Sequence, residues 1–230
     1  MQTIGLIGGI TPQSTIMYYQ VLNDLAEKKY GEFNSCKVII NSVNFAEIGQ
    51  LQKENQWDKL DEIMSAAARS LELAGAKSIL ICANTMHLTI DTVRKAVKIP
   101  VIHIAEATSD AIKEHQLKKV ALLGTKYTME KDFYKDVLKS FDIEVVIPNE
   151  KDRLLVHNTI YNELSKGILK KESKELYLKI INSLILDGAE GVVLGCTEIP
   201  LLIKQEDVGV PVFDTTTIHA TKAFSLATRL

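Results

Sequence analysis

Short apolar runs alternate with longer amphipathic segments from the start of the chain. Four runs have the length of a buried strand: residues 3–9, 37–43, 78–83 and 99–104. Apolar residues at helical spacing mark the segments between them, at residues 11–28, 57–73, 84 onward and 105–115. In the first of these helices the spaced apolar positions are Ile16, Tyr19, Leu22 and Leu25. Strands that alternate with helices predict a parallel sheet with helices on both faces.

The same series restarts in the second half of the chain. Further strands are predicted at residues 118–124, 143–148, 191–196 and 210–214, with a long helix at 172–186. We therefore expect an α/β protein made of two pseudo-symmetric, three-layer α/β/α domains with mainly parallel sheets.

The strongest sign of duplication is at the third strand of each half. LAGAKSILICANT (residues 73–85) aligns without gaps with LDGAEGVVLGCTE (residues 186–198), which places Ala83 opposite Cys196. Ligands of parallel α/β sheets bind at the carboxyl ends of the strands. The pairing suggests a site between two halves with one reacting group from each, of which one is missing.

Cys196 is the candidate reacting group. It ends a buried strand and precedes a predicted helix, and a helix N-terminus lowers the pKa of a thiol, so we expect an acidified base or nucleophile. Cys82 stands one position before the residue that matches Cys196, and successive strand side chains point to opposite faces, so Cys82 is expected in the core. Cys36 is also interpreted as a buried structural thiol.

Two other groups of residues are candidates for binding or metal chemistry. The glycine loop GLIGGITPQST is an imperfect match to a nucleotide motif, and is interpreted as a strand-to-helix turn that also holds a carboxylate or amino group of a small substrate. His87, His103 and His219 are dispersed along the sequence without metal-ligand spacing, so no metal is expected. His87, one turn into its helix, remains a candidate to line the pocket.

Composition favours a small molecule as the binding partner. Lys plus Arg is 27 against 29 for Asp plus Glu, so the net charge of −2 gives no electrostatic reason to expect nucleic acid or an anionic membrane. No apolar run approaches the roughly 20 residues of a membrane helix. We expect a cytoplasmic protein.

At these motifs the chain resembles the cofactor-independent aspartate/glutamate racemase family. The similarity extends along essentially the whole chain, through GLIGGITPQSTIMYY, NTMH, ALLGTKYTMEKDFY, GCTEIPLL and PVFDTTTIHA. The resemblance implies an active site in the cleft between the domains, a homodimer, and neither pyridoxal phosphate nor metal. It also implies that the last strand and C-terminal helix pack on the first domain, which gives domains of residues 1–99 plus 212–230 and residues 100–211.

The implied activity is the interconversion of L- and D-aspartate, or glutamate, within D-amino-acid biosynthesis. Two-base proton transfer at the α-carbon needs a base on one face and an acid on the other, roles implied for Cys196 and for residue 83. The resemblance implies a substrate-binding set of Ile10, Gln52, Asn84, Thr85, Thr125, Tyr161, Thr197 and Glu198. Within it Asn84, Thr85 and Thr197 would stabilise the carbanion at the substrate carboxylate, and Glu198 would orient the amino group.

Two departures from the family pattern bear on activity. Members carry cysteine or threonine where this chain has Ala83, and a methyl group cannot move a proton. Cys196 alone is expected to exchange the proton on the face of the L-enantiomer, with inversion severely impaired, whether Ala83 was introduced to trap substrate or belongs to a natural single-cysteine relative. Ile48 and Ser165 occupy positions where aspartate-specific members often have arginine and lysine, which leaves Gln52, Tyr161 and Lys166 as weaker candidates for the distal carboxylate.

Two alternatives remain open at this point. One is a non-catalytic amino-acid-binding protein, for which Ala83 is the evidence. The other is a single-cysteine decarboxylase or cis–trans isomerase of the same fold.

Overall fold

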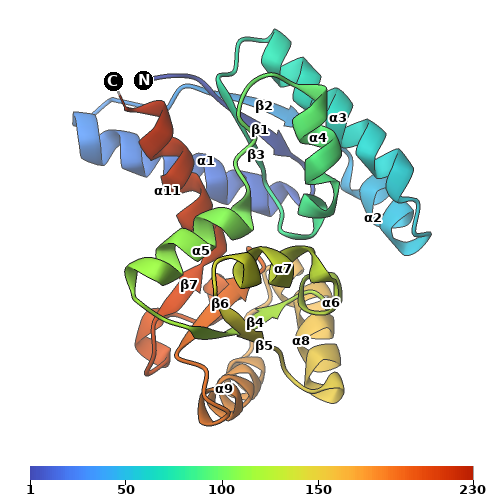
Figure 1. The fold of residues 1–230 in the computed structure, drawn as a ribbon, viewed down its shortest axis with the longest axis vertical. Helices are drawn as coiled ribbons and strands as arrows, with labels where there is room; N and C mark the ends of the chain where they lie inside the picture. Colours follow the sequence, from blue (N-terminus) through green and yellow to red (C-terminus); the bar gives the residue numbers. More distant parts are fainter. Residues whose placement is uncertain (230) are drawn as a thin grey trace. The chain divides into compact units, whose positions relative to one another are not determined.

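The computed structural model describes residues 1–229, which form two compact α/β units (Figure 1). The first unit comprises Met1–Ile104 and the C-terminal residues from His219, and the second comprises Ala105–Ile218. No helix in the described part of the chain has the length and apolar character needed to cross a membrane.

The sheet of the first unit has three parallel strands. They are β1 (Ile4–Gly8), β2 (Val38–Ser42) and β3 (Ser78–Ile81), in the order β2-β1-β3. Gly8 is in register with Ser42, and Ile7 with Ile81, so the three carboxyl ends lie along one edge. Segments that follow these ends are therefore placed side by side.

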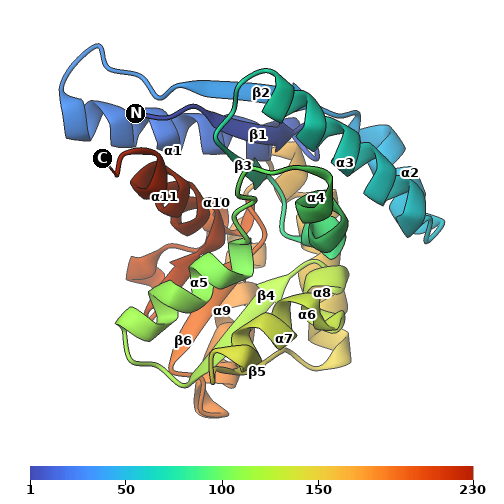
Figure 2. The ribbon, with the colours of Figure 1, turned by 45° about the horizontal axis from the view of Figure 1, so that its top comes forward.

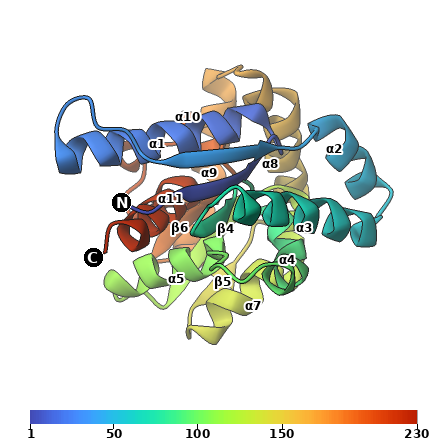
Figure 3. The same cartoon turned by 90° about the horizontal axis from the view of Figure 1, so that it is seen from above.

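Helices cover both faces of this sheet. α1 (Pro12–Tyr30) and the end of α11 (Thr215–Ala227) pack on one face through residues such as Tyr18 and Phe224. α3 (Trp57–Leu73) packs on the opposite face through residues such as Met64, and Figure 3 shows α1 and α3 on opposite sides of β1. Three short helices complete the unit: α2 (Phe45–Lys53), η1 (Thr85–Thr89) and α4 (Ile90–Ala96).

The second unit is built on four parallel strands. They are β4 (Lys119–Gly124), β5 (Glu144–Val146), β6 (Gly191–Gly195) and β7 (Val212–Asp214), in the order β5-β4-β6-β7. Gly124 is in register with Gly195 at the carboxyl edge. A Cβ on Gly124 would lie 2.9 Å from the Gly195 carbonyl oxygen, so both glycines allow the two strand ends to approach.

The helices of the second unit also form two layers. α8 (Glu150–Asn162) and α9 (Lys171–Leu186) share an apolar core with one face of the sheet. α5 (Ile104–Glu114) and α7 (Asp132–Ser140) lie on the other face (Figure 2), where Tyr134 Oη donates a 3.1 Å hydrogen bond to Thr108 Oγ1. The remaining short elements are α6 (Lys126–Glu130), η2 (Leu164–Lys166), α10 (Ile199–Leu202) and η3 (Gln205–Asp207). The predicted α/β class with two parallel sheets is confirmed.

Two predicted features near the unit boundaries are wrong. Residues 99–104 do not form a strand: Val101 makes a single bridge to Ile79, and α5 begins at Ile104. The strand at residues 212–214 was assigned to the first domain, but β7 pairs with β6 and extends the second sheet. The chain returns to the first unit only at His219, within α11.

The buried face of α1 also differs from the prediction. Ile16 and Tyr19 are 63% and 49% exposed, whereas Ser14 and Thr15 are buried. The small residues face inward because α1 passes close to β1: a Cβ on Gly8 would meet Thr15 Cγ2 at 2.5 Å. Close packing against a glycine therefore overrides the apolar periodicity in the first turns.

Candidate functional site

The turn between β1 and α1 uses its own donors internally. Gly9 has φ +80°, and a Cβ there would clash with the Val43 carbonyl oxygen. Its N–H donates to Thr15 Oγ1 at 2.9 Å, while Thr11 Oγ1 accepts from the Ser14 N–H at 3.2 Å. The Gly9 N–H is therefore already used inside the turn and is not the donor that was expected to hold a substrate group. The geometry is that of a tight strand-to-helix turn.

Ala83 and Cys82 point to opposite faces at the end of β3. Cys82 is fully buried in the core beneath α1, which confirms its predicted structural position. Burial raises the pKa of its thiol far above the usual range. Ala83 is half-buried and packs against the core on the α3 side. The residue opposite Cys196 in the repeat thus lies at the strand end without a proton-transfer group.

The other predicted residues of the first unit gather around this strand end. Ile10 and Met86 belong to the apolar cluster that Ala83 touches. Gln52 Nε2–H donates to Met86 Sδ at 3.1 Å, which ties α2 to the segment after β3. Asn84 is buried and Thr85 begins η1. Because η1 is a single short 3-10 helix, the expected positive helix end at this place is weak.

A carboxylate receives two hydrogen bonds at the end of β6. Cys196 Sγ–H donates to Glu198 Oε2 at 2.9 Å, and Thr197 Oγ1–H donates to the same oxygen at 2.7 Å. All three side chains are at least nine-tenths buried. The structure therefore places Glu198 as a direct partner of the thiol, in addition to the role expected for it at an amino group.

Cys196 is a protonated thiol in this environment, contrary to the expected acidification. Burial raises its pKa well above the usual value, and the negative charge of Glu198 and its hydrogen bond raise it further. Backbone hydrogen bonds from Glu198 and Thr197 lower it by less. The helix expected to acidify the thiol, α10, has only four residues, so its dipole is small.

Thr125 and Tyr161 lie in the same half of the predicted site. Thr125 follows Gly124, the register partner of Gly195, and its Oγ1 accepts from the Thr128 N–H at 3.3 Å as the cap of α6. Burial, followed by Coulombic interactions with Cys196, Tyr127 and Glu198, raises the pKa of the Tyr161 hydroxyl to about 12. The Tyr161 hydroxyl is therefore neutral and lies within electrostatic range of Cys196 and Glu198.

The sequence reasoning missed His157 beside Tyr161. The two rings have centroids 4.7 Å apart, and His157 Nδ1 accepts from the Lys126 N–H at 3.2 Å. Burial and the charge of Lys126 lower the pKa of His157. Its position four residues before Tyr161 on α8 is the signal that places both on one helix face.

Neither Ile48 nor Ser165 supplies a cation at the positions where aspartate-specific members often have arginine and lysine. Ile48 is fully buried in the core of the first unit, and Ser165 Oγ donates to the Tyr161 carbonyl at 2.9 Å. Lys166 lies in η2, directly after Ser165. Within residues 1–229 no three His, Cys, Asp or Glu side chains are grouped so as to hold a metal ion.

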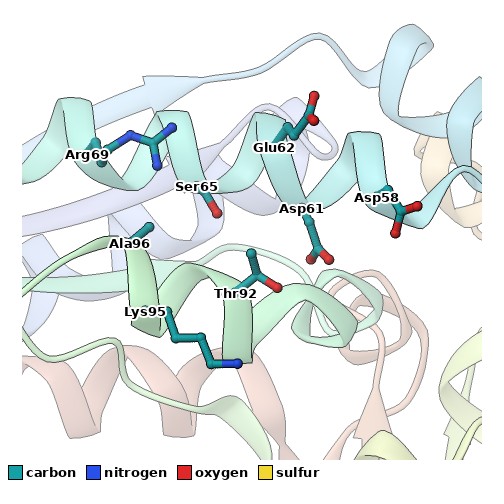
Figure 4. A pocket seen from close by; sticks show the side chains of 8 residues that line it. All are labelled: Asp58, Asp61, Glu62, Ser65, Arg69, Thr92, Lys95 and Ala96. Carbon is teal, nitrogen blue, oxygen red and sulfur yellow. The ribbon is translucent and has the colours of Figure 1, made fainter.

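A separate surface hollow lies between α3 and α4 (Figure 4). It is lined by Asp58, Asp61, Glu62, Ser65, Arg69, Thr92, Lys95 and Ala96. Burial raises the pKa of Asp61, the hydrogen bond from Thr92 lowers it, and the charge of Asp58 raises it. None of the predicted site residues lines this hollow.

Comparison with known proteins finds relatives along nearly the whole chain. The sequence profile of the family described as Asp/Glu/Hydantoin racemase matches residues 7–223. The chain is 23% identical over 225 residues to the broad specificity amino-acid racemase RacX of Bacillus subtilis strain 168, covering 96% of each chain.

Solved structures superpose on the full chain. A Yersinia pestis protein provisionally described as an Asp/Glu racemase is 43% identical with a TM-score of 0.94, and each chain is covered to 100%. An aspartate racemase homologue from Pyrococcus horikoshii OT3 is 41% identical with a TM-score of 0.90, again over 100% of both chains. With the family profile spanning nearly the whole sequence, this chain belongs to the Asp/Glu/Hydantoin racemase family.

Proposed function

We propose that the protein acts at the α-carbon of an amino acid, with Cys196 exchanging the α-proton on one face. The observation that carries this proposal is the Cys196–Glu198 hydrogen bond of 2.9 Å at the end of β6. A thiol next to a carboxylate can lose its proton to a partner already in contact. Aspartate and glutamate are the proposed substrates, and the RacX relative supports testing neutral amino acids as well.

The proton balance is simple. Cys196 Sγ–H passes its proton to Glu198 Oε2 against the raised pKa of the thiol, so the thiolate and the neutral carboxylic acid are a transient pair formed in the substrate complex. The thiolate then takes the α-proton, and the electron pair of the broken C–H bond moves into the substrate carboxylate. After the thiol proton has exchanged with solvent, Cys196 returns a proton to the same face of the α-carbon and takes one back from Glu198, which restores both side chains. Backbone N–H groups of Thr197 and Glu198 that face the sulfur would stabilise the thiolate. Asn84, Thr85 and the Tyr161 hydroxyl are the proposed donors to substrate oxygens.

Residue 83 is proposed as the second acid/base position. A racemase must return a proton on the opposite face, and the Ala83 methyl group cannot supply one. The protein with Ala83 is therefore expected to exchange the α-proton with solvent and retain configuration. Ile10, Gln52 and Thr125 are proposed to line the site. The homodimer, the cytoplasmic location, the role in D-amino-acid biosynthesis and the independence from pyridoxal phosphate stay predictions.

The test compares three proteins in deuterated water with L-aspartate, L-glutamate and neutral L-amino acids. Loss of the α-proton NMR signal reports exchange, and chiral chromatography reports inversion. We expect exchange without inversion for the parent, and both for Ala83→Cys. Cys196→Ala should lose at least about 10²-fold in exchange, the usual range for removing a general base.

Each alternative has its own outcome. Ligand binding without exchange by the parent or by Ala83→Cys would favour the amino-acid-binding protein, for which Ala83 is the supporting observation. Exchange that survives in Cys196→Ala would remove Cys196 from the mechanism. Release of carbon dioxide from the substrate would favour a decarboxylase.

A further inference from the structure

Three histidines that are far apart in the sequence lie together in the first unit. His87 in η1, His103 before α5 and His219 in α11 are each at most 4% exposed. The His87 ring centroid is 4.9 Å from that of His103 and 5.5 Å from that of His219. The proton-transfer scheme above uses none of them.

The partners of His219 determine which of its nitrogens carries the proton. Nε2 lies 2.9 Å from the Ile102 carbonyl oxygen, which can only accept, so Nε2–H donates. In the neutral ring Nδ1 then accepts, and it does so from the Tyr18 hydroxyl at 2.8 Å. His219 is therefore a neutral Nε2–H tautomer that links α1 to the segment before α5.

His87 is fixed in the opposite tautomer. The Ile104 N–H can only donate, and it donates to Nε2 at 3.2 Å, so Nε2 carries no proton. Nδ1–H then donates to the Ala83 carbonyl oxygen at 2.8 Å. The carbonyls of Asn84 and Ile102 also face the ring, while the directed bond from Nδ1 goes to Ala83.

The hydrogen bond from His87 to the Ala83 carbonyl oxygen restrains the backbone at position 83, which carries the side chain expected to transfer a proton. A fixed carbonyl fixes the peptide plane between residues 83 and 84, and with it the Asn84 N–H, and it restricts rotation about the Cα–C bond of residue 83, which carries the side chain. The His87 N–H also donates to the Asn84 carbonyl at 3.0 Å, so one residue holds two consecutive carbonyls. Ile104 is the last residue of the first unit before the chain leaves it, and it locks the tautomer.

We propose that His87 is a positioning residue that orients the end of β3, so that the side chain at position 83 and the Asn84 N–H face the substrate. This inference rests on the proposed function, which assigns position 83 to proton transfer. His219 supports it indirectly: it holds the Ile102 carbonyl, two residues before the Ile104 N–H that fixes the His87 tautomer. A misplacement of about 1 Å at an acid/base group can cost about 10²-fold in rate, so positioning is measurable.

Two substitutions test separately the two ring hydrogen bonds of His87, to the Ala83 carbonyl oxygen and from the Ile104 N–H. An asparagine amide nitrogen lies near the position of Nδ1, so His87→Asn keeps a donor for the Ala83 carbonyl and loses the acceptor for Ile104. A glutamine amide reaches the position of Nε2, so His87→Gln keeps a partner for the Ile104 N–H and loses the donor to Ala83. Both replace a buried ring by a smaller amide, and their losses in thermal stability should be similar.

The experiment is made in the Ala83→Cys protein, with His115→Gln as a control at an exposed histidine. We expect His87→Gln to lower kcat for inversion at least about 10-fold with KM changed less than about 3-fold, and His87→Asn to recover most of kcat. Equal losses of kcat in the Asn and Gln variants would overturn the proposal in favour of simple core packing, and no loss in either would overturn it by showing that the bond to residue 83 does not affect the reaction.

Histidine ¹⁵N NMR of the parent provides a readout that does not depend on activity. We expect His87 as the Nδ1–H tautomer, and a shift of the residue-83 carbonyl ¹³C resonance in His87→Gln that is smaller in His87→Asn. An Nε2–H tautomer would overturn the proposal. If Ala83→Cys neither exchanges nor inverts any amino acid while these spectra agree, the proposed function fails and the hydrogen bond from His87 to residue 83 stands.

Discussion

Cys82 and Ala83 show how one step along the chain changes the surroundings of a side chain. Cys82 and Ala83 differ by one step along the chain at the end of β3, so Cys82 lies in the core on the α1 side and Ala83 packs, half-buried, on the α3 side. That alternation is readable from sequence, and it assigned Cys82 correctly. The pKa of Cys196 was not readable, because it depends on burial by residues distant in sequence and on the rotamer of Glu198.

Glu198→Gln tests the role of the carboxylate at the residue scale. Removing its charge removes a cause of the raised Cys196 pKa, so the thiolate fraction at pH 8 should increase. Glutamine cannot accept the thiol proton, so α-proton exchange should nevertheless fall about 10²-fold. Thiolate absorbance in the ultraviolet, measured against Cys196→Ala, reports the first quantity, and exchange in deuterated water the second.

A matched control for this substitution is Glu175→Gln, which makes the same change of charge on an exposed part of α9. Glu175→Gln should change neither the thiolate fraction of Cys196 nor the rate of α-proton exchange. An increase of exchange in parallel with the thiolate fraction in Glu198→Gln would show that the carboxylate only suppresses the thiolate and takes no proton.

At the scale of elements, the sequence predicted best where pattern and packing agree. The helix at residues 57–73 is observed with those bounds as α3, because its apolar stripe faces the sheet. α2 and α8 were missed: α2 is held by the Asn44 cap, whose Oδ1 accepts from the Ala46 N–H, and α8 has weak amphipathicity. The predicted strand at residues 99–104 failed because Ile104 already begins α5.

Alanine substitutions at two glycines are expected to change the free energy of unfolding in opposite directions. Gly9 has φ +80° and no room for a Cβ beside the Val43 carbonyl, so Gly9→Ala should lower the free energy of unfolding by at least about 2 kcal/mol. Gly49 lies inside α2 with open space around it, so Gly49→Ala should raise that free energy by about 0.5–1 kcal/mol. Chemical denaturation of both variants checks the pair, and a neutral Gly9→Ala would contradict the turn geometry.

At the scale of the whole molecule, the duplication predicted two α/β units but not the route between them. The chain leaves the first unit at Ile104 and returns at His219, and the prediction placed the return before β7. The strand VFD has no sequence feature that tells which sheet it joins, since apolar strands of either sheet look alike. The histidine cluster is not predictable from the sequence for a related reason. His219 joins His87 and His103 only because the chain returns to the first unit after passing through the second.

That cluster gives the molecule a pH-dependent stability. Burial, then Coulombic interactions with Arg94 and His219, lower the pKa of His103 to about 3, and burial with the Coulombic interaction with His87 lowers that of His219 to about 3. His87 is lowered as well, by burial and His103. An unfolded histidine titrates near pH 6.5, so below that pH the unfolded chain binds more protons than the folded one.

The free energy of unfolding should therefore be independent of these groups above pH 6.5 and fall as the pH drops from 6.5 towards 3. Each buried histidine contributes up to about 1.4 kcal/mol per pH unit to the slope. His103→Gln removes one such group, so its slope between pH 5 and 6 should be smaller than that of the parent by about this amount, whatever its absolute stability. Urea denaturation at several pH values measures both slopes, and equal slopes would mean that His103 is protonated in the folded protein.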